Sequence, residues 1–498
     1  MRVPVTPPRP LTTLSVLLIL VALGNFWVFG RFTVDDAFIT WRYGFNLIHH
    51  GIWAYNPDAF DLTQAYTNPV FALASIPVAA AGWDMVLAFK LLSLGVLAGI
   101  GWALIRLAEV RGRMAFLLAL LMVLPATVAH AVSGLETVLY GGALALWFIT
   151  QRLGHWRAAL GLALLLVLTR PEAWLLYGLH PLMLLMAAVP RRVLVAHLAA
   201  LGAMAALYFG FHLAWFGQAL PNTYFIKSGD GFSLSQAARI LPWALPGLLV
   251  LAFGHRRTGL ALVLYFGAVG YSYSGSDLLM NYMQRFAFQI MLPMALVLGW
   301  ALARKRLRFP GWGLAGLSGY VLAFGVTSGG LGEHLGIANY YPRLLESHVA
   351  FGRLLNGLAA DGRVGAFAAG DAGAPAYHAD IRALDTIGLA SSRRAQDGLT
   401  PDLVRAYAPD VLTFFADAQG LRDLPDRHDA LFTYAAEEGM SALCTLTWAS
   451  QYQLILYTRG PVPELTALCE ASLSANGADE LTFALRQLAS PPWVYWRE

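Results

Sequence analysis

The stretch T-V-D-D-A-F-I-T-W-R-Y, residues Thr33 to Tyr43, follows almost directly on an apolar run from Leu11 to Gly30. A run of that length can cross a bilayer core of roughly 30 Å. Two adjacent acids, Asp35 and Asp36, therefore stand where the chain is expected to leave a membrane. Because charged groups at this depth are costly unless they are paired or hydrated, the pair is a candidate functional site.

The composition of the chain predicts a polytopic α-helical membrane protein. Of its 498 residues, 57% are apolar and only 13% are charged, whereas about 25% are charged in soluble domains. The N-terminal run is longer than the apolar core of a signal peptide and no A-x-A-like cleavage site follows it, so we expect an uncleaved anchor. The net charge of +4 is carried in short loops between apolar stretches, and it does not indicate a nucleic acid partner.

The basic loops predict the topology of the membrane domain. Further apolar stretches fill residues 85–328, and alternate connections between them are basic: 106–113, 151–157, 190–192, 254–257 and 304–308. With a cytoplasmic N-terminus, all of these loops lie in the cytoplasm, as the positive-inside rule requires. This topology requires about eleven membrane spans if the short segment 69–83 lies at the membrane interface and does not cross. Stretches such as 157–169 are short, so the count can change by two.

The same topology brings ionisable residues to the outer side of the membrane. Charged side chains retained at a membrane boundary are functional candidates, although Arg and Lys at helix ends also serve as anchors. The first outer loop, 31–84, holds the opening pair. The outer charged residues are Asp35, Asp36, Arg42, Glu136, Arg170, Glu172, Lys227, Asp277 and Arg285.

The composition changes after the membrane domain, for which we assign residues 1–328. Residues 329–498 contain no spanning run, and strand-like segments at 364–370, 410–416 and 453–459 alternate with helix-like stretches. This pattern predicts a small α/β domain, placed in the periplasm by the topology.

Two smaller features of this domain bear on function. The glycines of G-L-G-E-H-L-G, residues 330–336, miss the spacing of the dinucleotide fingerprint and follow no strand, which argues against nucleotide binding. Cys444 and Cys469 are the only cysteines. In an oxidising compartment they can form a disulfide, and two free buried thiols are the alternative.

Six motifs carry a resemblance to a known family. They are V-D-D-A-F-I-T-W-R-Y (34–43), A-Y-T-N-P (65–69), S-G-L-E-T (133–137), L-T-R-P-E-A (168–173), L-P-N-T-Y-F-I-K (220–227) and G-D-A-G-A (370–374). In this order they resemble polyprenyl-phosphate-dependent GT-C glycosyltransferases, in particular the terminal arabinofuranosyltransferases of mycobacterial arabinan and their proteobacterial relatives. The tail departs from the family pattern at A-L-D-T-I-G-L (383–389), which leaves the sugar and the acceptor open.

The resemblance implies a glycosyltransferase of the bacterial inner membrane. Its donor is expected to be a polyprenyl-phosphate sugar, with arabinofuranose as the expected sugar, and its acceptor a glycan or a protein on the periplasmic face. It also implies that an aspartate of the first outer loop is catalytic, so Asp35 and Asp36 are the candidates. We favour Asp35 slightly, because it lies nearer the preceding span. The alternative is that the pair only begins a helix, where Asp is favoured.

The remaining polar residues of the outer side suit the other parts of such a site. Arginine and lysine bind phosphate oxygens, so the candidates for the donor phosphate are Arg42, Arg170, Lys227 and Arg285. A sugar site needs hydroxyl, amide, carboxylate and aromatic groups, and the candidates are Tyr66, Asn68, Glu136, Glu172, Asn222, Tyr224 and Asp277.

The sequence contains no metal-binding signature, since its histidines are scattered and no Cys/His spacing matches a zinc site. A divalent cation held by Asp35 and Asp36 remains open. A transporter or flippase of lipid-linked sugars is the alternative function, but it is expected to show polar residues near the midplane and internal repeats. In this sequence the charges gather on one side, and no repeat is visible.

Overall fold

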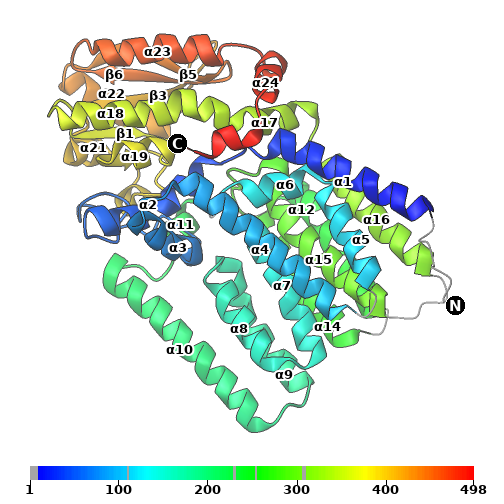
Figure 1. Ribbon diagram of the computed structural model, residues 1–498. Coiled ribbons are helices and arrows are strands. Elements are labelled where there is room, and N and C mark those ends of the chain that lie inside the picture. The colour runs from blue at the N-terminus through cyan, green and yellow to red at the C-terminus, as the bar shows by residue number, and fades with distance from the viewer. Residues whose placement is uncertain (1–8, 109–110, 228–230, 253–254, 305–309, 498) are drawn as a thin grey trace.

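The computed structural model describes residues 9–108, 111–227, 231–252, 255–304 and 310–497 (Figure 1). An α-helical bundle is followed by a smaller α/β region. The helices of the bundle are α1 (Arg9–Phe29), α2 (Asp35–His49), α3 (Pro69–Ala80), α4 (Met85–Leu107), α5 (Arg111–Met122), α6 (Pro125–Val132), α7 (Thr137–Leu153), α8 (Trp156–Val167), α9 (Leu176–Met186), α10 (Arg191–Phe216), α11 (Asn222–Lys227), α12 (Leu234–Ile240), α13 (Pro246–Ala252), α14 (Arg256–Ser274), α15 (Arg285–Arg304) and α16 (Pro310–Thr327).

Fewer described helices than expected have both the length and the composition of a membrane span. Within the described residues, four helical segments are long and apolar enough to span a bilayer: Met85–Leu107, Arg191–Phe216, Leu234–Ala252 and Tyr282–Arg304. Two bent helix pairs raise the number to six if each is one span. The expected count of about eleven is therefore not confirmed. One reason is helix length, since α8 has 12 residues, which is only about 18 Å of helix.

The spanning segments differ in what surrounds them. The apolar part of the segment that contains α15 is buried within the protein and lies at the centre of the bundle, whereas only 17% of the apolar part of α10 is buried. In Figure 1, α10 stands apart from the central helices, and the loop between α9 and α10 lies at the end farthest from the α/β region. Leucines exposed along α10 need no protein partner in a bilayer, because lipid chains are as apolar as they are.

Helices α2 and α3 lie between the bundle and the α/β region (Figure 1). Helix α3 begins with Asn68, whose Oδ1 accepts a hydrogen bond from the backbone N–H of Phe71 at 3.1 Å, as an N-cap residue does. A Cβ added at Gly44 of α2 would come within 2.7 Å of the backbone nitrogen of Ile76, so the close approach of the two helices requires glycine. The expected interfacial segment 69–83 is this helix, with 12 residues.

The α/β region consists of one sheet covered by helices on both faces. It contains α17 (Leu331–Leu344), a π-helical turn (Leu345–Val349), α18 (Ala350–Ala360), α19 (Ala374–Ala379), α20 (Ser392–Asp397), α21 (Pro401–Tyr407), α22 (Pro425–Glu437), α23 (Pro463–Asn476) and α24 (Glu480–Leu488). The strands are β1 (Ala366–Ala369), β2 (Arg382–Asp385), β3 (Val411–Asp417), β4 (Gly420–Leu421), β5 (Ser441–Ala449) and β6 (Tyr452–Thr458).

The strand order is β2-β1-β3-β6-β5, and β4 pairs with the end of β3. β1 is parallel to β2 and β3, whereas β6 is antiparallel to β3 and β5. Successive side chains of a strand point to opposite faces. Accordingly, Phe414 packs with residues of α21 and α22, and Phe415 packs with residues of α18 and α23. The three predicted strand-like segments correspond to β1, β3 and β6.

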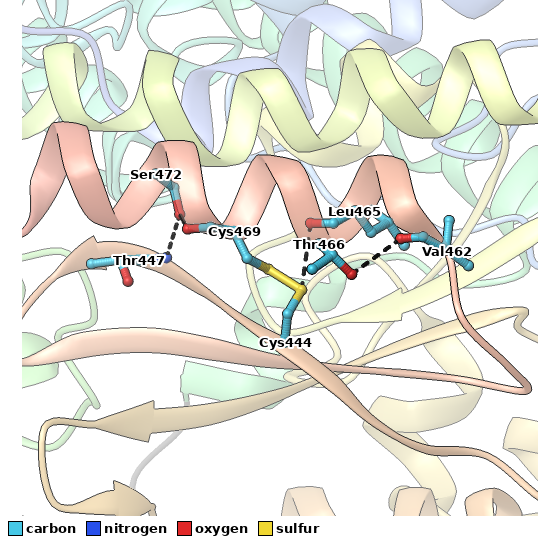
Figure 2. The surroundings of a disulfide bond; sticks show 7 residues. All are labelled: Cys444, Thr447, Val462, Leu465, Thr466, Cys469 and Ser472. Carbon is cyan, nitrogen blue, oxygen red and sulfur yellow. Dashed lines mark hydrogen bonds between the residues drawn. A yellow bond between two sulfur atoms is a disulfide. The ribbon is translucent and has the colours of Figure 1, made fainter.

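Cys444 and Cys469 form a disulfide that ties β5 to α23 (Figure 2). The backbone N–H of Thr447 donates to the hydroxyl of Ser472 at 3.0 Å, so a hydrogen bond joins the same two elements. The sequence left open whether the two cysteines form a disulfide or remain free thiols, and the structure shows the disulfide.

Reduction of this disulfide is expected to destabilise the α/β region by about 3–4 kcal/mol, because the bond closes a loop of 25 residues in the unfolded chain. Thermal unfolding of the purified protein with and without reductant measures the effect. The double variant Cys444→Ser/Cys469→Ser is the control and should not respond to reductant. An equal melting temperature of the wild type in both conditions would contradict the prediction.

Candidate functional site

A cavity of about 50 Å³ lies where α2, α11, α15 and the loops before α3, α7 and α9 meet. Its charged lining consists of Asp36, Glu136, Arg170, Lys227 and Arg285. Tyr66, Thr67, Asn68 and Thr223 add polar groups to the wall. The structure therefore brings together seven of the candidates from the sequence, which come from six separate segments of the chain.

Asp35 and Asp36 are the first two residues of α2 and face different surroundings. Asp36 lines the charged cavity. Asp35 is buried on the other side, where its carboxylate accepts hydrogen bonds from the backbone N–H groups of Gly373 at 3.0 Å and Ala374 at 2.7 Å. Successive residues of an α-helix point about 100° apart. The structure thus differs from our expectation that Asp35 is the residue turned toward the cavity.

Arg170 is neutralised within the protein. Its Nη1 donates to Glu136 at 2.6 Å, and its Nε and Nη2 donate to the two oxygens of Glu172 at 3.0 and 2.9 Å. Tyr273 also donates to Glu172, at 2.7 Å. Because all three charged side chains are largely buried, Arg170 serves first to hold two carboxylates at the wall of the cavity.

Lys227 and Arg285 are the two cations of the cavity that form no ion pair with any described residue. Burial and the neighbouring charges of Arg285 and Arg170 lower the pKa of Lys227, while the carboxylate of Asp36 acts in the opposite direction. The guanidinium of Arg285 lies 4.9 Å from the ring centre of Phe286, and its Nε is buried without a hydrogen-bond partner. These two cations are the ones available to an anionic ligand.

A second cavity, of about 320 Å³, adjoins the first and shares Thr67, Arg170, Thr223, Lys227 and Arg285 with it. Much of its additional wall is apolar, from Pro171, Leu175, Pro221, Ala268, Val269, Leu278 and Phe286. Of the sugar-site candidates, Glu172, Tyr224 and Asp277 line this second cavity. Lys227 and Arg285 therefore stand between a polar cavity and a more apolar one.

Two candidates do not reach either cavity, because they hold the outer loops to the α/β region. Arg42 is 1% exposed; its Nη2 donates to the carbonyl of Ile381 at 2.6 Å and its guanidinium lies over the ring of Tyr55. Its assignment to the donor phosphate is therefore corrected. Asn222 is 1% exposed and donates to the carbonyls of Leu389 and Ser391, so it fixes α11 rather than contacting a sugar.

Tyr66 and Asn68 line the charged cavity but also have structural partners. The hydroxyl of Tyr66 accepts a hydrogen bond from Trp53 Nε1 at 3.1 Å. Asn68 Nδ2 donates to Glu136 at 3.2 Å while its Oδ1 caps α3. Both side chains are thereby held in defined orientations at the cavity wall.

On the far side of Asp35, a cavity of about 140 Å³ is lined by a hydrogen-bonded cluster that the sequence reasoning missed. His348 Nε2 lies 2.8 Å from Asp371 Oδ2, and the hydroxyl of Tyr452 lies 2.9 Å from both oxygens of Asp371. Burial first, and the charge of Asp371 next, raise the pKa of Asp35 from 3.8 to about 7. Asp371 lies in the G-D-A-G-A motif, which was a usable signal, whereas nothing in the sequence marked His348 or Tyr452.

The described residues contain no group of three or more His, Cys, Asp or Glu side chains that could hold a metal ion. A divalent cation shared by Asp35 and Asp36 does not fit the geometry. Asp36 lines the charged cavity and Asp35 is bound to backbone N–H groups elsewhere, so the two carboxylates do not converge on one ion.

Comparison with known proteins identifies the fold. No protein-family profile matches the chain, and no curated protein matches it. Among solved structures, the chain is similar to ArnT from Cupriavidus metallidurans bound to undecaprenyl phosphate, with a TM-score of 0.51 and 12% sequence identity over 89% of this chain and 98% of that one. This similarity supports the GT-C fold that the sequence motifs predict. The chain thus shares its fold with ArnT over most of its length.

Proposed function

We propose that this protein transfers a glycosyl group from a polyprenyl-phosphate donor to an acceptor hydroxyl. The observation that carries the proposal is the charged cavity: a carboxylate, Asp36, and two cations without an ion-pair partner among the described residues, Lys227 and Arg285, line the same space. The likeness to a structure that holds undecaprenyl phosphate supports this class of donor.

Each group has a role that the reaction requires. The bond between the anomeric carbon and the phosphate oxygen breaks, and the polyprenyl phosphate leaves with the electron pair. Lys227 and Arg285 stabilise the charge that develops on this phosphate. The acceptor oxygen forms the new bond to the anomeric carbon, and Asp36 takes the proton of the acceptor hydroxyl. Arg170 holds Glu136 at the wall of the polar cavity, where Glu136 can accept hydrogen bonds from sugar hydroxyls. Glu172, the other partner of Arg170, lines the adjoining cavity.

The adjoining cavity suits the lipid part of the donor. It shares both phosphate-binding cations with the polar cavity and continues along apolar side chains such as Leu175, Val269 and Phe286. A phosphate bound between Lys227 and Arg285 would then have its sugar on the side of Asp36 and its first isoprene units on the apolar side. This arrangement matches the amphipathic chemistry of the donor.

The sequence resemblance supplies the finer assignment. We propose arabinofuranose as the sugar, a glycan or protein as the acceptor, and the periplasmic face of the bacterial inner membrane as the place of transfer, with residues 329–498 as a periplasmic domain. The test uses the detergent-purified protein and a panel of polyprenyl-phosphoryl sugars as donors. Water serves as the acceptor when no other acceptor is present. Release of free polyprenyl phosphate supports the proposal. Binding of the donors without any cleavage would instead support a transporter of lipid-linked sugars.

The proposed orientation predicts where tags along the chain are found. Reporters fused after Arg113, Arg192 and Arg308 should report the cytoplasm, and a reporter after Glu498 should report the periplasm. The reason is that the basic loops follow the positive-inside rule. Paired alkaline phosphatase and fluorescent protein fusions measure this directly. A cytoplasmic C-terminus would contradict both the topology and transfer on the outer face.

A further inference from the structure

One contact between the α/β region and the first outer loop is made by the G-D-A-G-A motif, residues 370–374, which the proposed reaction does not use. The motif leads from β1 to α19. Its Gly373 and Ala374 give their backbone N–H groups to the carboxylate of Asp35. Asp35 is 4% exposed and precedes Asp36 at the start of α2. The α/β region is thus bonded to the residue beside the proposed base.

Glycine is required at the point of contact. A Cβ added at Gly373 would lie 2.5 Å from the carboxylate carbon of Asp35, and it would meet the backbone carbonyl of Asp35 as well. Distances below 3.0 Å force something to move. Because the obstacle includes backbone, the shift cannot be absorbed by a flexible side chain alone. Any larger residue at position 373 must therefore push the first turn of α2 away.

The motif itself is held in place on its other side. Asp371 is bound by His348 from the π-helical turn and by Tyr452 from β6. At Gly370, an added Cβ would clash with the ring of Phe415, so the backbone there runs against β3. Loop 370–374 is consequently held rigidly, and it fixes the position of Asp35 relative to the sheet.

We propose that loop 370–374 is a positioning element of the reaction centre, which holds Asp35 and thereby sets the rotation of α2 that turns Asp36 into the charged cavity. Asp35 and Gly373 are then positioning residues, and Asp36 remains the group that meets the substrate. The inference rests on the proposed transfer reaction. It assigns the α/β region a direct part in catalysis, in addition to any role in acceptor binding.

The test compares Gly373→Ala with Gly460→Ala, a loop glycine of the same region at which an added Cβ meets nothing within 4 Å. Displacement of a reacting group by about 1 Å costs about 10²-fold in rate. We therefore expect kcat of Gly373→Ala to fall by about that factor, while the Kd for undecaprenyl phosphate and the donor KM stay within about threefold of the wild type. Gly460→Ala should match the wild type in all three.

Tyr452→Phe is the second variant, in case Gly373→Ala does not fold. It removes the hydroxyl that binds Asp371 and leaves the ring in place, and we expect it to lower kcat by about threefold to tenfold with unchanged undecaprenyl phosphate binding. Wild-type kcat in both variants, or in Tyr452→Phe alone if Gly373→Ala fails to fold, would overturn the inference. A wild-type protein that cleaves no polyprenyl-phosphoryl sugar would instead contradict the proposed function.

Discussion

Replacing Asp36 by Asn is expected to lower the rate of glycosyl transfer by about 10² to 10⁴-fold, the range that loss of a general base produces. The change keeps the size of the side chain and removes its ability to take a proton. Since Asp36 lines the cavity and no described residue forms an ion pair with it, the fold should not suffer. Transfer from a polyprenyl-phosphoryl sugar in detergent, with thermal unfolding in parallel, measures both effects.

The matched control is Asp361→Asn, which removes the charge of an exposed carboxylate at the end of α18. It should transfer at the wild-type rate. A fully active Asp36→Asn protein would rule out Asp36 as the general base. Loss of activity together with a lowered melting temperature would show that the residue acts in folding, which would also count against the assignment.

Replacing Lys227 or Arg285 by Ala is expected to weaken binding of undecaprenyl phosphate by about 10- to 100-fold in each case. A hydrogen bond to a charged group contributes about 1.5–3 kcal/mol, and neither cation has another ion-pair partner among the described residues. Binding measured with undecaprenyl phosphate in detergent, by calorimetry or by intrinsic tryptophan fluorescence, provides the affinities. The double variant should bind more weakly than either single variant.

Two arginines serve as comparisons for these variants. Arg353→Ala removes an exposed cation and should leave the affinity unchanged. Arg42→Ala removes a buried guanidinium that binds the carbonyl of Ile381, so it should lower stability and leave the affinity of the folded protein near that of the wild type. Equal binding by the wild type and by both Lys227→Ala and Arg285→Ala would assign these cations to the membrane interface instead.

Removing Arg170 is expected to act differently from removing the cations Lys227 and Arg285. The sequence analysis had placed Arg170 among the ligands of the donor phosphate. Its loss would leave Glu136 and Glu172 buried without their partner, and breaking such a pair costs about 3–5 kcal/mol. The sequence could not reveal this, because the pairing depends on how two loops 34 residues apart meet.

The sequence did predict which charges gather, for a simple physical reason. Side chains that lie near the ends of membrane helices on the same side are confined to one thin layer, so residues as distant as Asp36, Lys227 and Arg285 are brought to one depth. Three of the six strands of the α/β region, β1, β3 and β6, were also predicted, because short apolar runs alternate there with helical patterns. The strands β2, β4 and β5 were not predicted.

The direction in which each side chain points within that layer could not be predicted from the sequence. Asp35 and Asp36 differ by one residue, and one residue of helix rotation decides which of them meets the cavity. Arg42 and Asn222 are bound to the α/β region, whose contact with the outer loops has no periodic signal in the sequence. The expected number of spans is not confirmed for a related reason, since short apolar helices such as α8 and α9 have the composition of a span and lack its length.

The most direct test of this account is a structure of the protein with undecaprenyl phosphate, determined by electron cryo-microscopy in a lipid nanodisc. The account predicts that the phosphate lies within hydrogen-bond distance of Lys227 Nζ and the guanidinium of Arg285, with its first isoprene units against Leu175, Val269 and Phe286. The side of the phosphate that faces Asp36 should remain open for the sugar. A phosphate bound elsewhere, with Lys227 and Arg285 unengaged, would contradict the central claim.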